Sequence, residues 1–205
     1  MLLSRRHSFV FIHIQKTGGS SVERALTDAV PDVVRGFVDL PACHDPLKRR
    51  HLFASDLADF LGPTEWGRFY KFAFVRNPWS RLVSWYRMCV TRPSNPFMHF
   101  VRDNAPTFEA FLHLTEGPAR KTTFNQMDYL TDASGGLLVD FVGRFERLSD
   151  DFEHARARIG VTVALPHVNK GESLDYCTFY TDATRTLVAA RFARDIAAFG
   201  YAFGD

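Results

Sequence analysis

Residues 9–29 constrain the fold more than any other stretch, because a buried strand, a glycine-bearing loop and a helix follow one another there. Residues 9–14 (FVFIHI) form a nearly continuous apolar run, which is typical of a strand buried on both faces. The loop KTGGSS follows at residues 16–21, and apolar residues then recur at helical spacing from Val22 to Ala29. Strand, loop and helix in this order direct backbone N–H groups and the positive end of the helix dipole at one point. We therefore expect an anionic ester, a phosphate or a sulfate, to bind there.

The residue types in this loop suit such an anion. Gly18 and Gly19 let the backbone approach a ligand closely. Three further loop residues carry hydroxyl donors: Thr17, Ser20 and Ser21. Lysine and glycine in a tight turn can also be plain turn chemistry. The G-x-x-x-x-G-K-[ST] loop of ATP- and GTP-using enzymes is not matched, because Lys16 precedes both glycines.

A second predicted strand runs into a helix in the middle of the chain. Residues 69–75 (FYKFAFV) have the composition of a strand, and Asn77 and Pro78 suit the N-cap and the first turn of the helix that follows. Arg76 therefore lies at the carboxyl end of a strand, and Ser84 lies about two turns into the helix. Ligands of open α/β sheets bind at the carboxyl ends of the strands. Two such sites beside each other would hold a ligand with two separate anionic groups.

Strands and helices alternate along the rest of the chain. In chain order, we expect a short strand near 33–40, a helix from Ser55 to Gly62, a loop over 91–107 that is a candidate substrate lid, a helix from Thr107 to Leu114, a strand within 137–146, a helix from Ser149 to Ile159, a strand at 161–165 and a last helix from Asp182 to Gly200. This alternation indicates an α/β fold with a mostly parallel sheet flanked by helices. The length of 205 residues suits a single domain over residues 1–205.

Composition and charge argue against several classes of protein. With 46% apolar residues, the chain can fill a core, which argues against global disorder. The formal net charge of +2 argues against a nucleic-acid partner or a membrane-surface protein. We find no apolar stretch of about 18 residues and no apolar core of a signal peptide. Three widely spaced cysteines without a C-x-x-C motif suit a reducing compartment, so we expect a cytoplasmic protein.

Taken together, the loop at 16–21 and the pair Arg76 and Ser84, eight residues apart, resemble the two cofactor-binding signatures of the sulfotransferase family. Those enzymes use 3′-phosphoadenosine 5′-phosphosulfate (PAPS) as co-substrate and release 3′,5′-adenosine bisphosphate (PAP). The likeness covers roughly residues 8–203. Residues 126–130, 139–146 and 166–170 resemble the carbohydrate-type branch, and the chain looks like a small soluble bacterial member of it. The resemblance implies the P-loop-like sulfotransferase fold.

The resemblance assigns cofactor-binding roles to nine residues: Lys16, Thr17, Gly18, Gly19, Ser20, Ser21, Arg76, Ser84 and Lys170. Residues 16–21 would hold the 5′-phosphosulfate, with Lys16 stabilising the oxygen that bridges phosphate and sulfate. Arg76 and Ser84 would hold the 3′-phosphate, with Lys170 as a further ligand. The family requires no metal, and no cluster of His, Cys and Asp in the sequence argues for one.

The acceptor hydroxyl needs a general base, and histidine is suited to that role near neutral pH. His51 and His44 lie between the two signatures, where related enzymes keep their base, and we rank His51 first and His44 second. The alternative for His51 is a solvated surface position beside basic neighbours. His13 lies within the first strand, where we expect a buried residue with satisfied hydrogen bonds. Gln126 and Glu146 are further candidates for lining the site.

The sequence therefore predicts a PAPS-dependent sulfotransferase that moves a sulfuryl group to a hydroxyl of a sugar or glycoconjugate by in-line displacement. An ATP-dependent kinase of small molecules is one alternative, but it would need a magnesium-binding acid and a different placement of the lysine. A non-catalytic nucleotide-binding module is another, and it would keep Lys16 and Arg76 without needing a base.

Overall fold

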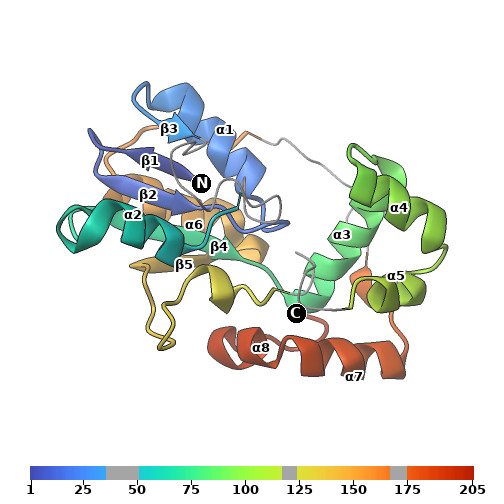
Figure 1. The fold of residues 1–205 in the computed structure, drawn as a ribbon. Helices are drawn as coiled ribbons and strands as arrows, with labels where there is room; N and C mark the ends of the chain where they lie inside the picture. Colours follow the sequence, from blue (N-terminus) through green and yellow to red (C-terminus); the bar gives the residue numbers. More distant parts are fainter. Residues whose placement is uncertain (36–50, 117–123, 167–174) are drawn as a thin grey trace. The chain divides into compact units, whose positions relative to one another are not determined.

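The computed structural model describes residues 1–35, 51–116, 124–166 and 175–205, and Figure 1 shows these parts as a coloured ribbon. They form two compact units, one of Met1–Val75 with Gln126–Lys170 and one of Arg76–Asn125 with Gly171–Asp205. Each unit has its own hydrophobic core and is described by itself.

The first unit is built around a five-stranded sheet in the order β3-β1-β2-β4-β5. Its strands are β1 (Leu2–Ser4), β2 (Phe9–Ile12), β3 (Val34–Arg35), β4 (Tyr70–Val75) and β5 (Phe141–Arg144). Strand β1 is antiparallel to both of its neighbours, whereas β2, β4 and β5 pair in parallel. Four of the five strands therefore run in the same direction, and the predicted α/β fold with a mostly parallel sheet is confirmed.

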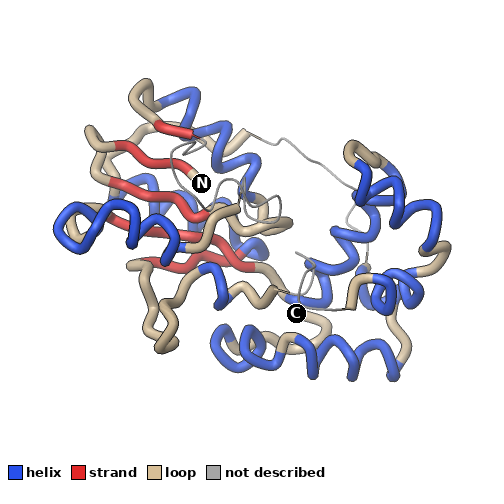
Figure 2. The backbone as a smooth tube through the Cα atoms, in the orientation of Figure 1, coloured by secondary structure: helices blue, strands red, loops and turns tan. Residues whose placement is uncertain are grey.

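Helices cover this sheet, which Figure 2 shows in red with the helices in blue. The first unit contains α1 (Gly19–Ala29), α2 (Ala54–Trp66), α6 (Leu148–Arg158) and two 3₁₀ turns, η3 (Met127–Tyr129) and η4 (Phe145–Arg147). Helices α1 and α6 share one core with the phenylalanines of β2 and β4. All four residues of β2 are buried, as expected of a strand covered on both faces.

The pairing of β2 with β4 positions the candidate site. Ile12 at the end of β2 lies opposite Ala73 of β4, and the two strands are parallel. Their carboxyl ends therefore lie at the same edge of the sheet. From β2 the chain passes through residues 13–18 into α1, and β4 ends at Val75, one residue before Arg76.

The second unit is helical. It contains α3 (Pro78–Thr91), α4 (Pro96–Asn104), α5 (Phe108–Leu114), the 3₁₀ turn η5 (Tyr176–Phe179), α7 (Asp182–Arg191) and α8 (Ala193–Phe199). Trp79 and Leu82 of α3 pack in one core with Phe108 and Phe111 of α5. The predicted caps of α3 and α5 are confirmed: the Asn77 side chain accepts from the backbone N–H of Trp79 at 3.1 Å, and that of Thr107 accepts from Ala110.

The expectation of a long loop over 91–107 is wrong, because α4 (Pro96–Asn104) lies within it. The Asn95 side chain accepts a hydrogen bond from the backbone N–H of Met98 at 3.0 Å, and Pro96 occupies the first turn. Met98 and Val101 are buried against α3 and α5. Proline and asparagine here start a helix rather than mark a loop, so the lid assigned to this segment is withdrawn.

Several predicted boundaries also differ from the structure. Residues 161–165 are not a strand, and β1 was not predicted. Gly62 interrupts α2 at a φ of 74° instead of ending it, and the helix resumes from the following proline. The predicted last helix is broken at Phe192 into α7 and α8, although Gly200 ends it as expected, at a φ of 64°. The capping patterns therefore located most of the helices but not α4, and not all of the helix ends.

Candidate functional site

Two residues of the loop between β2 and α1 have backbone conformations that residues other than glycine rarely adopt. Lys16 has a φ of 68° and Gly18 a φ of 81°, both in the left-handed region. Gly18 is the N-cap residue of α1 and has no side chain with which to cap the helix, and the first turn carries no acidic residue. A lysine held in this strained conformation, beside an uncapped helix N-terminus, is typical of a loop that binds an anion.

A side chain at either glycine of the loop would meet a neighbouring side chain. A Cβ atom at Gly18 would lie 2.6 Å from Cδ2 of Leu148. A Cβ atom at Gly19 would lie 2.1 Å from Cδ2 of His13. The backbone of the loop therefore packs directly against the start of α6 and against the ring of His13.

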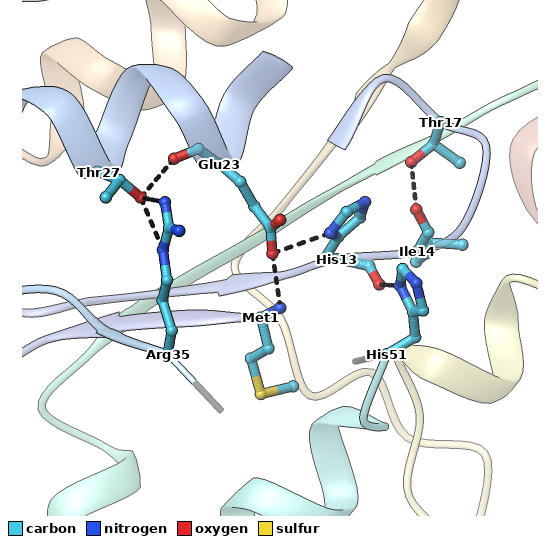
Figure 3. A network of polar contacts seen from close by, with 8 residues as sticks. All are labelled: Met1, His13, Ile14, Thr17, Glu23, Thr27, Arg35 and His51. Carbon is cyan, nitrogen blue, oxygen red and sulfur yellow. Dashed lines mark hydrogen bonds and ion pairs between the residues drawn. The ribbon is translucent and has the colours of Figure 1, made fainter. Parts of the chain in front are cut away.

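The hydroxyl groups of the loop have different surroundings. The hydroxyl of the buried Thr17 donates to the backbone carbonyl of Ile14 at 3.0 Å, and this hydrogen bond stabilises the conformation of the loop (Figure 3). Ser20 is exposed and Ser21 is half-buried. The predicted contact of Thr17 with a phosphate would therefore use its backbone N–H group, whereas Ser20 presents a hydroxyl to solvent.

His51 lies next to this loop and is bound to its backbone. The Nδ1 atom of His51 is 2.8 Å from the carbonyl oxygen of His13, the residue that follows β2 (Figure 3). A carbonyl oxygen only accepts hydrogen bonds, so Nδ1 of His51 carries the proton. In the neutral ring, Nε2 then holds the lone pair and can accept a proton. His51 is half-buried, so this contact argues against the alternative interpretation, in which His51 is only a solvated surface residue.

His13 is buried, as expected, and its hydrogen-bond partner is Glu23. The Nδ1 atom of His13 lies 2.9 Å from Oε1 of Glu23, which also accepts from the N-terminal ammonium of Met1 at 3.1 Å. Burial by itself would raise the pKa of Glu23, but the hydrogen bond and charge of His13, together with the ammonium, lower it from 4.5 to about 2. The ring of His13 meets the ring of His51 edge to face, with centroids 4.6 Å apart.

In the second unit, Arg76 and Ser84 are set by helix α3. The Nε atom of Arg76 donates to Oγ of Ser80 at 2.9 Å. Ser80 and Ser84 are four residues apart and therefore share one face of the helix. The Nδ2 atom of Asn77 donates to the carbonyl oxygen of Ala202 at 2.8 Å, which ties the segment that carries Arg76 to the C-terminal residues.

The remaining candidates differ in how well the structure describes them. His44 and Lys170 lie outside the described residues. Gln126 is fully buried, whereas Glu146 is exposed. Glu23 and Ser80 were missed by sequence reasoning. Ser80 could have been found from its position one helical turn before Ser84, but no sequence pattern links Glu23 to His13.

Two broader properties concern only the described ranges. No three side chains of His, Cys, Asp or Glu in these ranges come together in a way that could hold a metal ion. Among the helices that the structure describes, none combines the length and the apolar character needed to cross a membrane.

Comparisons with known proteins agree with this architecture. The sequence matches the model of the sulfotransferase family over residues 1–202. No curated protein matches the sequence closely enough to count as a relative. Among solved structures, the chain is similar to mouse sulfotransferase SULT7A1 complexed with PAP, with a TM-score of 0.59 and 15% sequence identity, over 95% of this chain and 86% of that chain. At this identity the structural likeness concerns the fold.

Proposed function

The chain belongs to the sulfotransferase family, and on this premise we propose that it transfers a sulfuryl group from PAPS to a hydroxyl of a sugar or glycoconjugate. The family match makes the chain a sulfotransferase-family enzyme, and the co-substrate of that family is PAPS. The acceptor class is our inference from the carbohydrate-type motifs at 126–130, 139–146 and 166–170.

The observation that carries the proposal is the contact between His51 and the carbonyl oxygen of His13 at 2.8 Å. It places a histidine beside the loop that carries Lys16 and leaves Nε2 as the basic atom of the neutral ring. A general base must lie within reach of the hydroxyl that it deprotonates and must accept a proton near neutral pH. Two features support His51 for this role: it lies beside the residue that follows β2, and in the neutral ring its Nε2 atom carries the lone pair.

The loop supplies the groups that an anionic leaving group needs. The uncapped N-terminus of α1 offers backbone N–H groups to the 5′-phosphate, which fits the acid-free first turn of this helix. Lys16 stabilises the negative charge that develops on the oxygen bridging sulfur and phosphorus. Arg76 and Ser84 are our candidates for binding the 3′-phosphate, and Lys170 is a further one.

The reaction follows from these roles. His51 Nε2 accepts the proton of the acceptor hydroxyl while the acceptor oxygen forms a new bond to sulfur. The bond from sulfur to the bridging oxygen breaks in line with this attack, and its electron pair remains on the phosphate of PAP. Lys16 balances that charge, so that positioning and electrostatics supply most of the catalysis. His44, which lies outside the described residues, remains the second candidate for the base.

Substitution of His51 tests the proposal. We expect His51→Ala to lower the rate of transfer from radiolabelled PAPS to a glycan acceptor by about 100-fold or more, because general-base catalysis contributes factors of this size. Binding of PAP, measured by calorimetry, should stay close to that of the wild type.

His7 offers a matched control, because its Nδ1 atom also contacts a backbone carbonyl, that of Ile159, at 3.2 Å in the same unit. His7→Ala should leave turnover unchanged. Unchanged turnover in His51→Ala would remove this residue from the mechanism and favour His44. Failure of the wild type to transfer sulfate to any sugar acceptor, while phenols or other alcohols are sulfated, would overturn the carbohydrate assignment alone.

A further inference from the structure

The side chain and the backbone of His13 hold His51 from two directions. The carbonyl oxygen of His13 accepts the Nδ1–H of His51 at 2.8 Å, which fixes the tautomer of that ring. The ring of His13 meets the same ring edge to face, with an interplanar angle of 75° and centroids 4.6 Å apart. The position of the His51 ring therefore depends on how the ring of His13 is turned.

Glu23 and Gly19 determine how the ring of His13 is turned. Glu23 lies one helical turn beyond Gly19 in α1, and its Oε1 atom is 2.9 Å from Nδ1 of His13 (Figure 3). The opposite edge of the ring rests on Gly19, where a Cβ atom would lie 2.1 Å from Cδ2 and 2.3 Å from Nε2. One edge of the ring is therefore held by a carboxylate and the other by a glycine backbone.

The Glu23 carboxylate helps to stabilise the fold, since it accepts from both His13 and the N-terminal ammonium, but it also supplies something that an apolar side chain could not. The side chains of His13 and Glu23 are only 8% and 20% exposed, and an apolar pair of the same size could fill the same buried space. What an apolar pair cannot supply is direction, because a hydrogen bond to Nδ1 fixes the rotation of the imidazole ring. Functional histidines are commonly oriented by a hydrogen bond from one ring nitrogen to a neighbouring residue, which sets the position and the basicity of the ring.

We propose that Glu23 and His13 form a positioning pair that holds the His51 ring in place for proton transfer. This inference rests on the proposed function, in which His51 is the base. Neither residue of the pair needs to touch the substrate: Glu23 acts through His13, and His13 acts through its contacts with His51. The pair thus extends the site from the loop into helix α1.

Three variants test the pair. Glu23→Leu removes the carboxylate with little loss of volume, and His13→Phe keeps a ring and the carbonyl but removes Nδ1. Each should lower kcat by about 10- to 100-fold, the cost of a small misplacement of a catalytic group, while the KM for PAPS and the affinity for PAP stay close to wild type. Glu23→Gln keeps an oxygen that can accept from Nδ1 of His13, so its kcat should lie much closer to that of the wild type than the kcat of Glu23→Leu does.

The double variant Glu23→Leu/His13→Phe distinguishes a pair from two independent residues. If the two side chains act as one unit, the double variant loses no more kcat than either single variant. Multiplied losses would overturn the proposal. Glu65→Leu is the control, since it removes the ion pair of Glu65 with Arg5 in the same unit, at 2.8 Å, and should leave kcat unchanged.

The form of the His51 ring provides a readout that does not depend on turnover. In protein with ¹⁵N-labelled histidine, the side-chain signals of His51 should report the Nδ1–H form in the wild type, because the carbonyl of His13 accepts that proton. They should shift or broaden in Glu23→Leu, because the ring of His13 that packs on His51 is then no longer held. A wild-type ring signal in that variant, or a loss of stability with unchanged kcat, would make the pair structural only. If the wild type transfers no sulfate but the His51 signals still change in Glu23→Leu, the proposed function fails and the positioning of His51 by the pair stands.

Discussion

At the scale of single residues, the chemistry of the candidate base is set by the main chain. A histidine has two ring nitrogens, and the one that carries the proton depends on its hydrogen-bond partner. The carbonyl oxygen of His13, one residue beyond the end of β2 at Ile12, accepts the Nδ1–H of His51. The end of a strand thus selects the tautomer of a histidine that lies 38 residues further along the chain.

A residue-scale prediction concerns Arg76. Arg76→Ala should weaken the binding of PAP by about 10- to 100-fold, the value of a lost hydrogen-bonded charge contact. Binding of adenosine 5′-phosphosulfate, which lacks the 3′-phosphate, should change much less. Titration calorimetry with both ligands measures the difference. Ser80→Ala keeps the guanidinium and removes one hydrogen bond of Arg76, at 2.9 Å, so it should have the smaller effect. Equal losses for the two ligands would contradict the assignment of Arg76 to the 3′-phosphate.

A second residue-scale prediction follows from the pKa of Glu23. Since folding lowers this pKa from 4.5 to about 2, the native state binds fewer protons at Glu23 than the unfolded state between these values. The carboxylate therefore stabilises the fold above about pH 4.5, and this contribution is lost as the pH falls toward 2.

We expect the free energy of unfolding of Glu23→Gln to lie about 1 to 3 kcal/mol below that of the wild type at pH 6. This gap should close on acidification. Urea titrations at several pH values measure it, and a gap that does not depend on pH would show that the charge of Glu23 contributes nothing.

At the scale of elements, the N-cap residue of α1, Gly18, combines a left-handed backbone with close packing against neighbouring side chains. Gly18 and Gly160 both have a left-handed backbone, with φ of 81° and 65°. Only Gly18 faces side chains that a methyl group would meet, since a Cβ at Gly160 has no atom within 4 Å. The two positions therefore separate backbone strain from steric exclusion.

We expect Gly160→Ala to lower the free energy of unfolding by about 1 kcal/mol through backbone strain alone. Gly18→Ala should cost about 2 to 4 kcal/mol, because strain and overpacking against Leu148 add. Denaturant unfolding of both variants measures the difference. Adding Leu148→Ala should reverse part of the loss in Gly18→Ala and none of it in Gly160→Ala. Equal costs at both glycines would contradict the packing explanation.

At the scale of the whole molecule, PAP should act as a stabilising ligand. A ligand that binds only the native state at 100 times its Kd adds about 2.7 kcal/mol to the free energy of unfolding. For a chain of this length, such a gain raises Tm by about 5 to 10 °C. A thermal-shift titration with PAP measures this rise, and ATP with Mg²⁺ should produce a smaller one. A larger shift with ATP and Mg²⁺ would favour the kinase alternative over the sulfotransferase.

The predictable parts of the fold are those in which neighbouring residues carry the signal. The apolar run of β2, the KTGG loop and the Asn77–Pro78 start of α3 all depend on local chemistry, and each was placed within a few residues. Strand β1 was not predicted, because a stretch of three residues is too short to show the alternation of a strand. Its place in the sheet depends on pairing with β2 and β3. Helix α4 was not predicted, because the prolines and asparagines of residues 91–107 favour a loop. In the structure Asn95 and Pro96 start a helix, whose Met98 and Val101 are buried in the core of the second unit.

The sequence by itself determined the order of strand, glycine-bearing loop and helix, the family, and the candidates Lys16, His51 and Arg76, because these depend on residue types at short spacing. Only the tertiary structure decided that Glu23 meets the ring of His13, that the carbonyl of His13 meets His51, and that Gly19 leaves room for the imidazole ring. Contacts of this kind join segments separated along the chain, and no local preference encodes the distance between them. They arise when the sheet and its helices pack, since packing alone brings the end of β2, the start of α1 and the segment before α2 together.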